Sequence, residues 1–97
     1  MIVRVFRAKV HRHLHAEFEE KFRTISVDVV EGQEGNVSLT IGRPTQWAPD
    51  EFVMVSTWRD EQAIAGMAGP DWSQAHIPAG MGQYIVQCWV HHYEVIE

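Results

Sequence analysis

The sequence predicts an α+β domain with two helices and an antiparallel sheet of four strands, in the order β-α-β-β-α-β. Three observations predict it: stretches with apolar residues at helical spacing, shorter runs rich in β-branched residues, and glycine or proline between them. We expect residues 1–97 to form a single domain, because a chain of this length can bury only one modest core.

The first half of the chain predicts a strand, a helix and a second strand. Residues 2–10 are dense in β-branched and apolar residues with basic residues interspersed, which indicates a strand with two different faces. From Leu14 to Val30 the apolar residues recur every three or four positions, as on one helix face: Leu14, Phe18, Phe22, Ile25 and Val29. Gly32 or Gly35 can end this helix in a left-handed conformation. Residues 36–41 then alternate, which is typical of a strand.

The second half predicts a strand, a short helix and a last strand. Residues 51–58 carry apolar side chains on both faces of a strand. A helix opens at Arg59-Asp60-Glu61 and breaks at Gly69-Pro70, and Asp71 can cap a further turn over residues 72–76. Residues 84–96 form the last strand.

This order of elements is the ferredoxin-like plan, in which both helices cover one face of the antiparallel sheet. The other face stays open, and residues 51–58 make it too apolar to face water. We therefore expect a homodimer in which two copies meet through their sheets.

Composition and charge exclude several classes of partner. A net charge of −5 and scattered basic residues disfavour nucleic acid and anionic membrane surfaces. No window approaches the roughly 20 apolar residues of a membrane span, and residues 1–7 lack the apolar core of a signal peptide. Cys88 is the single cysteine and lies in an apolar run. We expect a cytoplasmic protein.

Residues 51–63 resemble the hallmark of the antibiotic biosynthesis monooxygenase family. In both, a strand ends in a tryptophan, here Trp58, and an acidic helix start and an alanine follow. The helix-Gly-strand unit before it and the pair Ala75-His76 extend the resemblance over nearly the whole chain. The resemblance implies a dimeric α/β barrel with a small-molecule pocket between the helices and the sheet of each subunit. The family includes cofactor-independent oxygenases of polyketide quinols and heme-degrading oxygenases.

The heme-degrading branch offers the sharpest comparison. Its axial ligand is a histidine after the second helix, where His76 stands here. Its tryptophan on the second helix falls on Met67, and its asparagine near the end of the first strand falls on Phe6 or Arg7. One of the three residues is thus present.

Six residues are the candidates for the site. His76 can act as an acid, a base or a ligand, since its ordinary pKa is about 6.5; the alternative is a histidine bonded to a carbonyl at a helix end. Trp72 lies four residues before it, and Tyr84 can donate its phenol to a substrate or anchor a loop. Three further residues are expected to form the apolar wall of a substrate-binding pocket, and the alternative is that they are ordinary core residues: Met67, Phe22 and Met81.

The other histidines predict no metal site. His11, His13 and His15 would point one way but lie far apart in a strand, and they would diverge in a helix. His91 and His92 are adjacent in a strand and point to opposite faces. No phosphate loop, dinucleotide fingerprint or nucleophile elbow is present in the sequence.

The sequence and the resemblance together leave three functions open. The first is a monooxygenase of a planar aromatic or quinol substrate, without a cofactor and with His76 as the base. The second is a heme-binding or heme-degrading monooxygenase, with His76 as the axial ligand. The third is a non-enzymatic dimeric module that binds a small molecule or packs against an enzyme, because this scaffold hosts unrelated roles.

Overall fold

The computed structural model describes residues 1–75, 77 and 79–97, so His76 and Pro78 lie outside the described residues. The described part contains four strands and two helical regions, and the strands are β1 (Ile2–Val10), β2 (Asn36–Gly42), β3 (Glu51–Trp58) and β4 (Ile85–Glu94). The first helical region joins η1 (Arg12–Leu14), α1 (His15–Lys21), η2 (Phe22–Ser26) and α2 (Val27–Glu31). The second is α3 (Glu61–Ala68), and a short turn of 3-10 helix, η3 (Gly82–Tyr84), precedes β4. The expected order of elements is confirmed.

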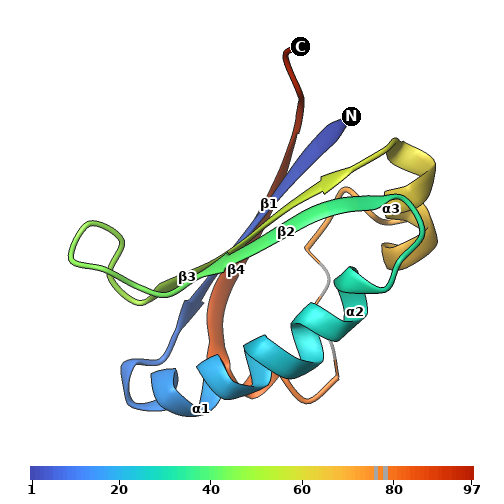
Figure 1. The fold of residues 1–97 in the computed structure, drawn as a ribbon. Helices are drawn as coiled ribbons and strands as arrows, with labels where there is room; N and C mark the ends of the chain where they lie inside the picture. The colour runs from blue at the N-terminus through green and yellow to red at the C-terminus, as the bar shows by residue number, and fades with distance from the viewer. Residues whose placement is uncertain (76, 78) are drawn as a thin grey trace.

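The four strands form one antiparallel sheet in the order β2-β3-β1-β4. Both helical regions lie on the same side of this sheet, and its other face carries no helix (Figure 1). This is the predicted ferredoxin-like fold. The termini lie side by side, and the backbone N–H of Val95 donates to the carbonyl oxygen of Met1 over 3.0 Å. The last strand is shorter than predicted, because Tyr84 belongs to η3 and the strand ends at Glu94.

The register decides which side chains of β1 face the helices. Phe6 pairs with Met54 of β3 and with Val90 of β4, while Arg7 pairs with Val53 and Trp89. Paired residues share a face, and Ala8 and Val10 are buried in the core. The even-numbered residues of β1 therefore point toward the helices, and the odd-numbered residues point to the open face.

The first helix differs from the prediction in its winding. Residues Phe22–Ser26 form a π-helical segment, in which the N–H of Val27 donates to the carbonyl oxygen of Phe22 five residues earlier. The buried face is consequently Phe18, Phe22, Ser26 and Val30. Four residues exceed one α-helical turn and fall short of a π-helical one, so the two windings together keep this face toward the sheet. After Phe22 the fully buried positions are Ser26 and Val30, while the predicted Ile25 and Val29 are half-buried.

The end of this helix also differs from the expectation. Gly32 follows the helix with φ −84°, so no left-handed residue terminates it. The left-handed glycine is Gly35, with φ 86°, in the turn to β2. A Cβ atom at this position would lie 2.5 Å from Cβ of Ala63, so the turn packs directly on the first turn of α3.

α3 begins and ends as the sequence predicts. The side chain of Asp60 caps it by accepting a hydrogen bond of 2.9 Å from the N–H of Ala63. Gly69, with φ 83°, follows its last residue. None of the helices among the described residues has the length and apolar content needed to cross a membrane.

Candidate functional site

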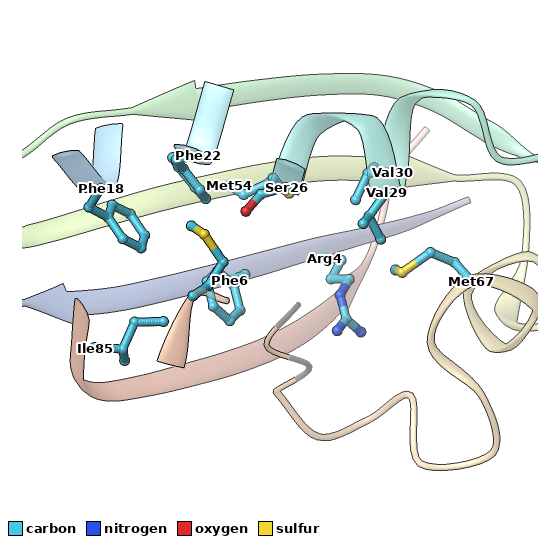
Figure 2. A pocket seen from close by; sticks show the side chains of 11 residues that line it. Arg4, Phe6, Phe18, Phe22, Ser26, Val29, Val30, Met54, Met67 and Ile85 are labelled. Carbon is cyan, nitrogen blue, oxygen red and sulfur yellow. The ribbon is translucent and has the colours of Figure 1, made fainter. Parts of the chain in front are cut away.

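A hollow lies between the first helical region and the inner face of the sheet, with α3 at one end. The space free of protein atoms there is about 500 Å³, which includes open solvent at the mouth and is therefore an upper bound on the cavity itself. Figure 2 shows Phe18, Phe22 and Ser26 entering from the helix, and Phe6 and Met54 from the sheet. The side chains that line it are Arg4, Phe6, Phe18, Phe22, Ser26, Val29, Val30, Met54, Met67, Met81 and Ile85.

The described walls of this pocket are mainly apolar and rich in phenylalanine and methionine side chains. The rings of Phe18 and Phe22 stack at 5.1 Å between centroids along the helix. Three predicted wall residues, Phe22, Met67 and Met81, line the pocket, and they come from η2, α3 and the loop before η3. Aromatic and thioether groups form a flat, adaptable apolar surface. The pocket therefore suits a planar, largely apolar molecule.

Among the described lining residues Arg4 is the charged one, and it is buried, with 5% of its surface exposed. Its Nη1 donates to the carbonyl oxygen of Trp72 over 2.6 Å and lies 2.8 Å from Nε2 of His92. No carboxylate among the described residues lies within 4.0 Å of its guanidinium. Burial lowers the pKa of Arg4 from its ordinary value, but a guanidinium remains protonated in proteins. The pocket thus contains a positive charge without an acidic partner in the described part of the chain.

His92 holds Arg4 from the neighbouring strand. Because a guanidinium has no acceptor, Nε2 of His92 accepts this hydrogen bond and the ring is neutral. Desolvation, the charge of Arg4 and neighbouring His91 lower the pKa of His92, which agrees with a neutral ring. The indole of Trp72 meets this imidazole edge to face at 4.9 Å. As expected from their spacing, His91 lies on the other face of β4 and does not take part.

The remaining predicted site residues lie outside the wall or outside the described chain. Trp72 contributes its carbonyl to the Arg4 cluster, and its side chain is not among those that line the pocket. Tyr84 is buried in the core with its ring 6.0 Å from Phe18. His76, the proposed catalytic residue, lies outside the described residues. The roles of these three residues stay predictions.

The sequence interpretation missed several pocket residues, Arg4 and Ser26 above all. Phe6, Met54 and Ile85 also line the pocket and carry no signal beyond that of ordinary core residues. The sequence did contain a signal for Arg4. Arg4, Phe6 and Ala8 are alternate residues of β1, so their side chains lie on the same face of the strand, and this places a charge on the buried face. Ser26 could not be predicted as a pocket residue from α-helical spacing, because the π-helical segment Phe22–Ser26 is what turns it toward the sheet.

The histidines after β1 form hydrogen bonds and ring contacts. Nε2 of His15 lies 3.1 Å from the carbonyl oxygen of Val10 and 3.2 Å from Oδ1 of Asp50. The rings of His11 and His13 are 5.9 Å apart. Within the described residues, no group of three or more histidine, cysteine or acidic side chains could hold a metal ion.

Solved structures share this fold over nearly the whole chain. A Nitrosomonas europaea protein with the description antibiotic biosynthesis monooxygenase aligns at a TM-score of 0.78, with 16% identity over all of both chains. SnoaB, a cofactor-independent oxygenase from Streptomyces nogalater, aligns at 0.74 with 18% identity over 99% of this chain and 93% of its own. MhuD, a heme-degrader from Mycobacterium tuberculosis with two hemes bound in its active site, aligns at 0.74 with 17% identity over 100% and 97%. At these identities the similarity establishes the fold.

The family assignment comes from the sequence itself. No curated protein matches the chain. The family profile described as antibiotic biosynthesis monooxygenase matches residues 1–76, which include β1 to α3 and the segment up to His76. The chain therefore belongs to the antibiotic biosynthesis monooxygenase family.

Proposed function

We propose that this protein is a cofactor-independent monooxygenase that acts on a planar aromatic substrate of the quinol type. The observation that carries the proposal is the hollow between helix and sheet, whose described walls are mainly apolar and rich in phenylalanine and methionine side chains. The family membership and the likeness to a cofactor-independent oxygenase support the reaction type. The walls favour a flat ring over a flexible or strongly polar molecule.

The chemistry needs little from the protein beyond binding and proton transfer. An electron-rich phenol that loses its proton passes an electron to O₂. Oxidation of an activated ring methylene to a carbonyl consumes one O₂ and releases one water, so the substrate itself supplies the electrons. The pocket would position the ring and exclude water, and a positive charge such as Arg4 would stabilise the anion.

His76 is our proposed base. This role rests on its position after α3 and on the family resemblance, since the residue lies outside the described chain. A histidine suits the task because its ordinary pKa of about 6.5 lets it accept a proton near neutral pH. Phe22, Met67 and Met81 would hold the ring, and Trp72 and Tyr84 are proposed to complete the substrate site.

Oxygen uptake with a panel of quinols tests this proposal. We expect uptake well above the protein-free rate, and a fall of about 100-fold or more in His76→Ala if the residue is the base. Ser26→Leu is the matched pocket variant, because Ser26 lines the hollow and the larger side chain would occupy part of it. Uptake no faster with protein than without it contradicts the enzymatic proposal, and ring binding without turnover would favour the non-enzymatic binding module.

A heme-binding role is the second candidate, favoured by the similarity of the fold to a heme-degrader. The described residues offer a flat apolar surface, with Phe6 and Met67 on the pocket wall. By the resemblance, Met67 stands where the heme branch carries tryptophan, and Phe6 or Arg7 stands where it carries asparagine. The proposed axial ligand is His76. Titration with hemin tests this candidate: a Soret band that is lost in His76→Ala supports it, and an unchanged hemin spectrum dismisses it.

We also propose that the protein is a homodimer that associates through the open faces of its sheets. The centre of that face is apolar, since the directly paired residues Val5 and Val55 both point to it beside Val3 and Val53. Arg7 covers the ring of Trp89 at 5.3 Å and lies 3.7 Å from Glu51, so the charged end of the face is internally paired. An apolar strip bordered by paired charges suits a second copy of the same surface.

A further inference from the structure

We propose that the ligand of the pocket is a flat aromatic acid whose carboxylate is held by Arg4. The inference rests on the proposed function in one respect: it takes the hollow between helix and sheet as the ligand site. It adds the charge of the ligand and the residue that recognises it.

Arg4 differs from the other arginines in its pairing. Outside the pocket, each arginine lies within 4.0 Å of at least one carboxylate: Arg7, Arg12, Arg23, Arg43 and Arg59. Arg4 is the most deeply buried of the six and has no such partner among the described residues. A buried charge is costly unless it is paired. A bound anion would supply the pair that the described chain does not.

The orientation of the Arg4 guanidinium also favours an anion. Nη1 is occupied by the carbonyl oxygen of Trp72 and by Nε2 of His92, which fixes the plane of the group. Nε and Nη2 donate to no acceptor in the described part of the chain. The N–H groups on this edge run parallel, and this fork matches the two oxygens of a carboxylate. His92, being neutral, adds no second positive charge.

The rest of the pocket wall, as far as the described residues form it, is apolar. Among these lining residues, Arg4 and Ser26 are the polar ones. Arg4 lies toward the end occupied by Met67, while Phe18 and Ile85 lie toward the other end (Figure 2). One guanidinium balances one negative charge, and a doubly charged phosphate would leave an unpaired charge against apolar walls. A monovalent acid at one end and a ring system along the aromatic end fit this distribution.

Matched ligands test the inference directly. Calorimetric titration of the full-length protein compares 2-naphthoate with 2-naphthamide, which has the same ring and a neutral head group. Charge-assisted hydrogen bonds predict a preference for the acid of about ten- to a hundredfold. In Arg4→Met we expect this preference to vanish while the amide binds as before. Arg23→Met is the control, because it removes the same charge from the exposed side of the helix, and its preference should stay unchanged.

Each outcome decides the inference. Acid preference that disappears in Arg4→Met and persists in Arg23→Met supports it. Equal binding of the two ligands by the wild-type protein overturns it and leaves the proposed pocket standing, whereas binding of neither ring overturns the pocket as well. If Arg4→Met does not fold, Arg4→Lys replaces it: the charge remains but the fork is lost, and an undiminished preference in that variant contradicts recognition by two parallel bonds.

Discussion

Gly35→Ala tests how tightly the turn before β2 is packed on α3. Gly35 has φ 86°, and an added Cβ would lie 2.5 Å from Cβ of Ala63. The turn cannot shift freely, because the N–H of Arg59 donates to the carbonyl oxygen of Gly35 over 2.8 Å. The left-handed conformation costs a residue with a side chain about 1–2 kcal/mol, and overpacking costs about 1–3 kcal/mol. We expect a loss of roughly 2–4 kcal/mol once the reduced entropy of the unfolded chain is included.

Thermal unfolding followed by circular dichroism measures this loss. For a domain of this size, the expected change lowers the midpoint by roughly 10–30 °C. Gly66→Ala in α3 is the control, since nothing lies within 4 Å of its added Cβ, and helix propensity predicts a gain of up to about 1 kcal/mol. A double-mutant cycle with Ala63→Gly isolates the contact, with an expected coupling of about 1–3 kcal/mol. Unchanged stability in Gly35→Ala, or no coupling, refutes the reasoning.

Two further predictions concern the opposite faces of the sheet. The pKa of His92 is lowered in the folded protein, so the unfolded chain binds the proton more tightly and stability falls as the pH drops below about 6.5. In His92→Gln, whose amide oxygen can still accept from Arg4, denaturant titrations at pH 8, 6 and 5 should show a weaker pH dependence than in wild type; equal dependence contradicts the assignment. Val55→Glu places a charge at the centre of the open face, and sedimentation should find a dimeric wild-type protein and a monomeric variant. A monomeric wild-type protein would dismiss the proposed homodimer.

The fold could be predicted from the sequence because its signals are local. Alternation in residues 36–41, the acidic start of α3 and the Gly-Pro break after it each identify an element without knowledge of its neighbours. The antiparallel sheet then follows from the ferredoxin-like order of elements, while its register, with Val5 opposite Val55, is known from the structure. Such signals also identified Phe22, Met67 and Met81 as apolar residues facing the interior, which is where the pocket lies.

The polar part of the site could not be predicted in the same way. Parity on β1 can indicate that Arg4 points inward. However, its hydrogen-bond partners stand 68 and 88 residues away in the sequence, at Trp72 and His92. Only the packing of the segment after α3 and of β4 against β1 brings them together. The local pattern therefore identifies a buried charge, and the tertiary structure shows that no described carboxylate neutralises it.

The winding of the first helix explains why there is a hollow at all. With α-helical winding throughout, Ile25 would continue the apolar face of Phe18 and Phe22, and its branched side chain would occupy space above the sheet. The π-helical segment turns Ser26 to the sheet instead, and its small side chain leaves the space open (Figure 2). The hydroxyl of Thr24 donates to the carbonyl oxygen of Glu20 over 3.1 Å within this stretch. The pocket thus depends on one change of winding combined with one small residue, which is why a leucine at position 26 should abolish ring binding without unfolding the protein.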